Sequence, residues 1–255
     1  MIAKRLKMGL IAALSVMALL LPVAFLSNAG PDTVLEVGIF SGAAEGTALP
    51  SGWTPMTFSK IPRHTRYDLV KDGDLVVVKA TSEASSSGLI RRIRIDPVEY
   101  PIIEWRWKVL NIYKKGDVRK KEGDDYPARI YVTFEYSPSD MGLFDKVKYE
   151  TARLLYGEYP PGGAITYIWE SKAPKGTIAA NPYADQVRMI VVESGTTRLN
   201  QWIREERNIY EDYQAVFKKK PPLVSGVAVM TDSDNTGESA VSFYGDIIFK
   251  KTANQ

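Results

Sequence analysis

Short segments in which apolar and polar residues alternate make up most of the chain, and clusters of Gly, Pro, Asp and Ser separate them. A period of two is typical of strands that bury one face, because successive side chains of a strand point to opposite sides. The breaker clusters predict turns between the strands. The pattern predicts strands at Val34–Phe40, Trp53–Phe58, Leu75–Ala80, Leu89–Ile95, Ile102–Val109, Ala128–Tyr136, Ile165–Glu170, Val187–Glu193, Val224–Met230 and Val241–Lys250.

Two segments carry apolar residues at helical spacing instead. In Leu143–Tyr156 they recur every three or four positions until Gly157 ends the pattern. In Asn208–Lys218 the same spacing follows Asn208, which is a suitable N-cap residue. The sequence therefore predicts two short helices among many strands.

Three of the predicted strands alternate clearly enough to assign their faces. Trp105 and Trp107 fall on the side of the aliphatic residues, which favours a core position over an exposed platform for sugar stacking. The predicted inward sets are Ile103, Trp105, Trp107 and Val109; Ile130, Val132 and Phe134; and Val241, Phe243, Ile247 and Phe249.

These elements predict an all-β protein with two short helices, built as an antiparallel β-sandwich of the jelly-roll type. The chain has no cysteine, so its core must hold the fold without disulfides. Residues 30–255 are expected to form a single domain, which is long enough to bury a sizeable core.

Residues 1–29 have the features of a secretory signal peptide. A basic start, Lys4 to Lys7, precedes an apolar run, and the small residues Ser27 and Ala29 predict cleavage after Ala29. The alternative is an uncleaved anchor, because Met8–Leu26 has the 19 residues that could just cross a bilayer. Cleavage predicts a periplasmic or secreted protein without a membrane span. Since no cysteine follows the apolar run, lipoprotein processing is excluded.

Charge argues against nucleic acid as a partner. The whole chain has a formal net charge of +3, but the predicted signal peptide carries three basic residues and no acid, so the mature chain is neutral. Binding to a phosphate backbone requires a basic surface that displaces counterions. The composition gives no sign of such a surface.

Polar side chains on the outward faces of the three assigned strands are the first candidate site. If the strands are neighbours, these side chains form a tyrosine-bearing surface suited to a hydroxyl-rich ligand, although a solvated face with cross-strand ion pairs is the alternative. The candidate residues are Glu104, Arg106, Arg129, Tyr131, Glu135, Tyr244 and Asp246.

Most catalytic motifs are absent. His64 is the only histidine, which excludes a zinc site with two imidazoles, and there is no nucleophile elbow, phosphate-binding loop or dinucleotide fingerprint. His64 stands between Arg63 and Arg66 and is a candidate for binding an anionic sugar or for an elimination base, with a surface histidine as the alternative. Two of Glu104, Glu135 and Asp246 are the candidates for glycoside hydrolysis, which needs two carboxyl groups across a cleft.

The stretch MTDSDNTGESA, from Met230 to Ala240, is the candidate metal site. DSDNTG imitates the start of a calcium loop, but the twelfth position is Phe243 instead of glutamate and no helices flank it, so it is not an EF-hand. We expect a hairpin loop between the last two predicted strands. The alternative is an ordinary turn, which selects the same residues. The candidate calcium ligands are Asp232, Asp234, Asn235 and Glu238, with Asp124 from elsewhere in the chain; no other cofactor is expected.

Several phrases of the sequence resemble one known family. They are SGWTPMTF, IPRHTRYDLV, GLIRRIRIDPVEYPIIEWRWKV, GDDYPARIYVTFEY, RNIYEDYQAVF and VSGVAVMTDSDNTGESAVSFYGDIIF. They resemble the bacterial secreted family of domain of unknown function 3047, over Trp53 to Phe249. The resemblance implies an exported, β-rich single domain and brings no activity or catalytic residues with it.

Three functions are consistent with these observations. The first is a non-catalytic glycan-binding domain, similar in kind to carbohydrate-binding modules. The second is a polysaccharide-active enzyme: a lyase with His64 or Tyr131 as base and Arg106 or Arg129 facing a uronate, or a hydrolase with paired carboxylates. The third is an envelope module that binds another protein through Leu143–Tyr156 or the basic loop Lys114–Lys121.

Overall fold

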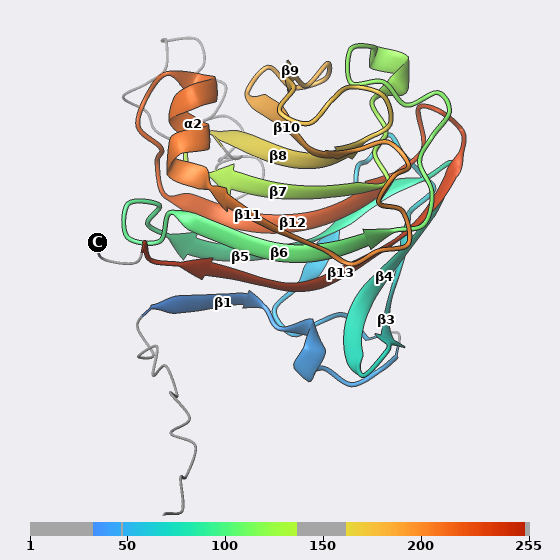
Figure 1. Cartoon of the computed structure of the whole chain (residues 1–255), viewed down its shortest axis with the longest axis horizontal. Helices are drawn as coiled ribbons and strands as arrows, with labels where there is room; N and C mark the ends of the chain where they lie inside the picture. The colour runs from blue at the N-terminus through green and yellow to red at the C-terminus, as the bar shows by residue number, and fades with distance from the viewer. Residues whose placement is uncertain (1–32, 47, 137–161, 253–255) are drawn as a thin grey trace, which may run out of the picture. The chain divides into compact units, whose positions relative to one another are not determined.

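Two β-sheets stacked face to face form the body of the computed structural model, which describes residues 33–46, 48–136 and 162–252 (Figure 1). All of these residues belong to the unit Pro31–Gln255. The first sheet has the order β11-β6-β13-β4-β3, with β1 also paired to β13. Its strands are β1 (Val34–Gly38), β3 (Arg66–Asp72), β4 (Leu75–Glu83), β6 (Ile102–Val109), β11 (Ile203–Asn208) and β13 (Ser239–Lys250).

The second sheet has the order β2-β5-β12-β7-β8-β10-β9. Its strands are β2 (Thr54–Met56), β5 (Ser86–Ile95), β7 (Ala128–Phe134), β8 (Gly163–Glu170), β9 (Ile178–Ala180), β10 (Val187–Ser194) and β12 (Val224–Asp232). Its pairs are antiparallel except for β8 and β10, which run parallel. The predicted β-sandwich is therefore confirmed, with one parallel pair in place of a wholly antiparallel arrangement.

The core between the sheets is built around the predicted tryptophans. Trp105 and Trp107 are at most 1% exposed and meet edge to face, with ring centroids 5.5 Å apart. Trp105 also stacks on Tyr167 at 5.2 Å, and Trp107 lies 6.1 Å from Trp169. The inward face predicted for Ile102–Val109 is confirmed, and so is the one predicted for Ile130, Val132 and Phe134.

A β-bulge in β13 makes part of its predicted face wrong. Tyr244 pairs with Trp107 and Ile247 with Trp105, so Gly245 and Asp246 together face one residue of β6. Because the bulge adds one residue, even-numbered residues of β13 face inward before it and odd-numbered residues face inward after it. Ile247 and Phe249 face the core as predicted. Before the bulge Tyr244 is fully buried, whereas Val241 and Phe243, both predicted to face inward, are half-buried on the outer side.

Three strands that the alternation did not predict are β3, β9 and β11. Each lies at an edge of its sheet and pairs with only one neighbour. In β3 and β11, charges of the kind that discourage pairing with other chains obscure the apolar periodicity, and β9 has only three residues. The charged run in β11, Arg204 to Arg207, is an example.

The helix α2 (Ile209–Phe217) begins where the sequence predicts. The side chain of Asn208 accepts hydrogen bonds from the backbone amides of Tyr210 and Glu211, and the helix ends at Lys218 in the left-handed conformation. The predicted helix Leu143–Tyr156 lies outside the described residues. The described residues also form two 3-10 turns, η1 (Phe40–Gly42) and η2 (Lys121–Gly123). In the described part of the chain no helix has the length and apolarity to cross a membrane.

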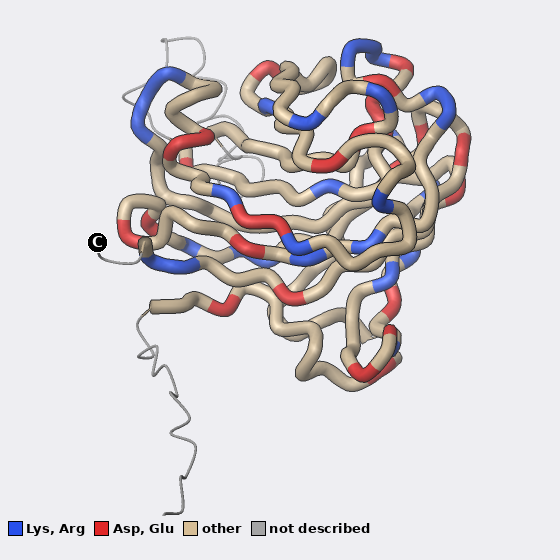
Figure 2. Tube along the Cα trace, in the orientation of Figure 1, with Lys and Arg blue, Asp and Glu red and all other residues tan. Residues whose placement is uncertain are grey.

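Charges of both signs are interspersed over the described chain (Figure 2). The outer face of the second sheet is divided between two environments. Over β8 and β10, Val118 and Tyr126 from the connection between β6 and β7 pack on Ile168, Met189 and Val191 in a second small apolar cluster. Over β5, β12 and β7 the sheet instead forms the floor of a pocket.

Candidate functional site

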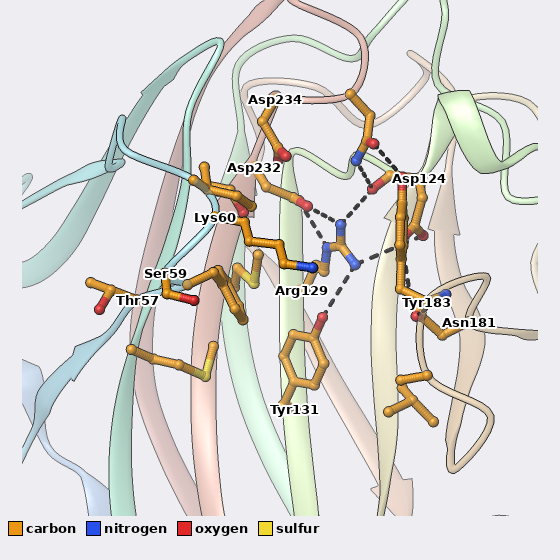
Figure 3. A pocket seen from close by; sticks show the side chains of 18 residues that line it. Thr57, Ser59, Lys60, Asp124, Arg129, Tyr131, Asn181, Tyr183, Asp232 and Asp234 are labelled. Carbon is orange, nitrogen blue, oxygen red and sulfur yellow. Dashed lines mark hydrogen bonds and ion pairs between the residues drawn. The ribbon is translucent and has the colours of Figure 1, made fainter.

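The pocket on the outer face of the second sheet has a volume of about 750 Å³. Arg129 and Tyr131 from β7 and Asp232 from β12 form its floor (Figure 3). Met230 from β12 also lines it. Its walls come from residues 56–61, the end of β2 and the loop after it, and from residues 181–187, the loop after β9 and the start of β10. Because β2 and β9 are the opposite edges of the sheet, the two loops face each other across the floor.

A buried ion pair lies at the base of the pocket. Arg129 Nε donates to Asp232 Oδ1 at 2.8 Å, its NH2 donates to Oδ2, and both side chains are nearly inaccessible to solvent. NH2 also donates to the carbonyl of Asp124 at 2.8 Å, and NH1 donates to the Tyr131 hydroxyl at 3.2 Å. Burial opposes the charged form, but the charges of Asp232 and its neighbours prevail and raise the pKa of Arg129 above its usual range. The guanidinium therefore stays charged.

The acidic loop between β12 and β13 is fixed by three groups. Asp125 accepts hydrogen bonds from the backbone amides of Asn235 and Thr236, at 3.3 and 2.6 Å. The Ser233 hydroxyl lies 2.7 Å from that of Ser82, near the end of β4. These contacts hold the loop against the sandwich.

Glu238 provides the third anchor at the other end of the loop. Its carboxylate accepts from the backbone amides of Lys114 and Lys115, at 3.0 and 2.9 Å. The loop does not join two paired strands, since β12 lies in the second sheet and β13 in the first. The predicted hairpin is therefore wrong, and the segment crosses from one sheet to the other.

Asp234 and Lys60 are the charged groups of the pocket that form no ion pair among the described residues. Burial, followed by the charge of Asp125, raises the pKa of the Asp234 carboxyl, although a hydrogen bond from Ser86 opposes the shift. Lys60 extends from the loop after β2 toward Arg129 (Figure 3). Both side chains line the pocket.

Two partly exposed aromatic side chains stand at the walls. Tyr183 is 56% exposed and Phe58 is 37% exposed, and they come from the two opposing loops. The Tyr183 hydroxyl donates to Asn235 Oδ1 at 2.6 Å, which ties its loop to the acidic loop. The ammonium group of Lys121 lies 4.7 Å from the centre of the Tyr183 ring.

Three carboxylates beside the pocket could hold a metal ion. One oxygen from each of Asp125, Asp232 and Asp234 lies within 4.8 Å of the others. Two of these were predicted ligands. Of the other predicted ligands, Asp124 and Asn235 line the same pocket, whereas both oxygens of Glu238 bind the backbone at Lys114 and Lys115.

The predicted polar surface is divided between the two sheets, because β6 and β13 belong to the first and β7 to the second. Only Arg129 and Tyr131 of that set reach the pocket. Tyr244 lies inside the sandwich, where its hydroxyl donates to the Met230 carbonyl at 2.6 Å.

The other candidates are separate and have structural partners. On the outer side of the first sheet, Glu104 pairs with Arg204 and Lys250, both at 2.6 Å, and Arg106 lies 4.8 Å from the Trp202 ring. Asp246 accepts from the Ser41 hydroxyl at 2.6 Å, and Glu135 pairs with Arg94 at 2.7 Å. His64 is exposed and does not line the pocket.

No pattern in the sequence indicates Lys60, Phe58, Asn181 and Tyr183 as site residues. All four lie in loops between strands. The predicted strand Trp53–Phe58 ends already at Met56, so its alternation does not give the direction of Phe58. Only the polar cluster NPYAD, which contains Asn181 and Tyr183, marks one of these loops as a turn.

Solved structures with similar arrangements include two carbohydrate-binding modules of Clostridium thermocellum. The family 11 module of cellulase Lic26A-Cel5E has 9% identity and a TM-score of 0.43, with 87% of this chain and 96% of that chain covered. The family 30 module of cellulase Cel9D-Cel44B has 11% identity and a TM-score of 0.39, with 86% and 99% covered. The K1 cleaved adhesin domain of Lys-gingipain from Porphyromonas gingivalis has 11% identity and a TM-score of 0.35, with 87% and 99% covered. These similarities are too distant to support an argument about ligands.

Sequence comparison identifies the family. No curated protein matches the chain. The profile of a protein family of unknown function, DUF3047, matches residues 51–248, which is most of the chain and includes both walls and the floor of the pocket. The chain therefore belongs to the DUF3047 family, as the phrases of its sequence predict.

Proposed function

We propose that the protein is a non-catalytic glycan-binding protein and that the pocket on the second sheet is its binding site. The observation that carries the proposal is the combination of exposed aromatic rings on opposing walls with hydrogen-bonding side chains between them. Tyr183 and Phe58 offer apolar ring faces, while Lys60 offers a hydrogen-bond donor and Asp234 an acceptor. Sugars have apolar ring faces and hydroxyl-rich edges, so this combination suits them.

A binding role is favoured over catalysis by the positions of the candidate catalytic groups. Glu104 and Asp246 belong to the first sheet, and Glu135 follows β7 of the second, so they do not converge on one cleft. Arg129 is paired with Asp232 and is not available to neutralise a uronate.

Titration calorimetry of residues 30–255 with neutral and acidic oligosaccharides tests the proposal. We expect Tyr183→Ala to weaken binding roughly threefold to tenfold, the effect of losing one aromatic contact. Trp202→Ala is the matched control, because Trp202 packs on Arg106 at the first sheet, away from the pocket. If every oligosaccharide fails to bind, or if the two variants behave alike, the proposed site is wrong.

We also propose that the protein is exported, with residues 1–29 removed and 30–255 forming one domain. The basic start, the apolar run and Ala29 support this. Sequencing the N-terminus of the protein from the periplasm or medium should give Gly30. Recovery of the intact N-terminus in the membrane fraction would instead identify an anchor.

Calcium is the ion we propose for the group Asp125, Asp232 and Asp234, because hard oxygen ligands select hard cations. Saturating calcium at about a hundredfold over its dissociation constant should stabilise the fold by roughly 2.7 kcal/mol. Asp234→Asn should abolish this stabilisation and Glu238→Gln should retain it, since Glu238 binds the backbone instead. A melting temperature that chelator leaves unchanged would exclude the ion.

A further inference from the structure

Some of the charged groups that line the pocket have ion-pair partners within the fold, and others do not. Arg129 and Asp232 neutralise each other. Asp124 is buried, lies 3.9 Å from Arg129 NH1 and accepts from the Asn181 amide at 3.1 Å. These three groups maintain the floor of the pocket and are nearly inaccessible to solvent.

Asp234 and Lys60 are different, since neither is part of an ion pair among the residues that the structure describes. The other acids of the loop have structural tasks: Asp232 binds Arg129, and Glu238 binds the backbone of Lys114 and Lys115. Asp234 is half-buried and Lys60 is exposed, and both side chains line the pocket (Figure 3). Neither side chain is therefore held by an ion pair within the described chain, and both can contact a ligand in the pocket.

We propose that Asp234 and Lys60 determine the specificity of the pocket by binding hydroxyl groups of a neutral sugar. This inference rests on the proposed glycan-binding function. The Asp234 carboxylate accepts a hydrogen bond from one hydroxyl, and the Lys60 ammonium donates to another. Hydrogen bonds that involve an ionised group are stronger than neutral ones, so two such contacts can dominate selectivity.

The charge of the lining favours a neutral ligand over a uronate. The pocket is lined by three carboxyl groups, Asp124, Asp232 and Asp234, and by two cations, Lys60 and Arg129. Only Lys60 among the cations is not already paired, and an acidic sugar that reached it would also approach the carboxyl groups. A hydroxyl can satisfy either sign of charge, because it both donates and accepts.

Calorimetric titration of four probes, in buffer with EDTA so that no cation occupies Asp234, tests the inference: cellotetraose, xylotetraose, mannotetraose and tetragalacturonate. We expect at least one neutral tetrasaccharide to bind more tightly than tetragalacturonate. Asp234→Asn and Lys60→Gln should each weaken its binding roughly tenfold to a hundredfold, the effect of losing a charged hydrogen bond. Melting curves of these variants should match the wild type, which separates lost contacts from lost folding.

Asp74→Asn and Lys220→Gln are matched controls, because both residues are exposed and lie outside the pocket. They should retain wild-type affinity. The inference is overturned if Asp234→Asn and Lys60→Gln also retain it, or if tetragalacturonate binds most tightly. Loss of binding in Tyr183→Ala would then still support the proposed function. If none of the four probes binds the wild-type protein, both proposals fail together.

Discussion

Arg129 and Asp232 form a two-point ion pair from neighbouring strands of the second sheet, and their side chains are only 2% and 3% exposed. The pair lies between the sheet and the acidic loop, where Asp232 also accepts from the backbone amide of Tyr126 at 3.1 Å. It therefore joins the floor of the pocket to the connection that leads into β7.

Removing one member of this pair should be strongly destabilising. We expect Arg129→Met or Asp232→Asn to lower the free energy of unfolding by about 3–5 kcal/mol, because each leaves a buried polar or charged group without its partner. The double variant Arg129→Met/Asp232→Leu should lose less than the sum of the single losses. Urea denaturation measures these differences.

The control is the surface pair Arg94–Glu135, whose side chains are 72% and 36% exposed. Arg94→Ala should change stability by less than about 1 kcal/mol, because solvent screens exposed ion pairs. Equal losses from the buried and the exposed pair would contradict this account of the pocket floor.

Glu205 should make stability depend on pH. Its carboxylate faces inward from β11 beside Glu193, and burial raises its pKa from 4.5 to about 7. The folded state therefore binds the proton more tightly than the unfolded state. Stability should be greatest below the unfolded pKa and should fall as pH rises from about 4.5 to about 7.

Glu205→Gln should remove this dependence. We expect the variant to be more stable than the wild type by about 1–2 kcal/mol near pH 8, a value reduced for the partial exposure of the side chain, and similar to it near pH 4. Thermal melts across this range measure the difference. A constant difference at all pH values would show that Glu205 is not the titrating group.

The N-cap of α2 provides a local test of the fold. Asn208 accepts from two backbone amides at 3.1 Å, so Asn208→Ala should lower stability by about 1 kcal/mol, while Asn208→Asp should keep most of it. Urea denaturation of the two variants measures the difference. If alanine were tolerated as well as aspartate, the cap would not stabilise the helix.

Close packing behind the pocket predicts an effect of Gly88. A methyl group at this position would lie 2.7 Å from both the Val229 carbonyl oxygen and the end of Met56. Gly88→Ala should lower stability by about 1–3 kcal/mol through this overlap. In Gly42→Ala the nearest atom is 3.8 Å away, on Ile39, so this control should change stability little.

The sequence predicts the interior of this protein much better than its pocket. Trp105 and Trp107 are identified as core residues because β6 pairs on both sides and alternates without interruption. The same logic fails for Tyr244, because the bulge at Gly245 and Asp246 adds a residue that no periodicity reveals. The alternation correctly predicts that the Arg129 side chain points away from the core. The burial of this side chain, however, depends on loops that fold over the sheet.

The pocket could not be predicted because its walls are far apart in sequence. Lys60 and Tyr183 lie in loops from opposite edges of the sheet, and only the strand order brings these loops together. The acidic loop is a candidate metal site in the sequence, but its composition does not show which of its acidic side chains are bound to other groups of the fold. That assignment depends on backbone amides at Lys114, Lys115, Asn235 and Thr236.

The passage of the acidic loop from β12 to β13 has a mechanical consequence. Residues 233–238 and the two-residue link between β4 and β5 bridge the two layers of the sandwich side by side, so force that separates the layers at this end must stretch both. A molecule seated against Asp234 would stiffen the bridge. Occupancy of the pocket should then be detectable as slower hydrogen exchange in both sheets, including strands that the molecule never touches.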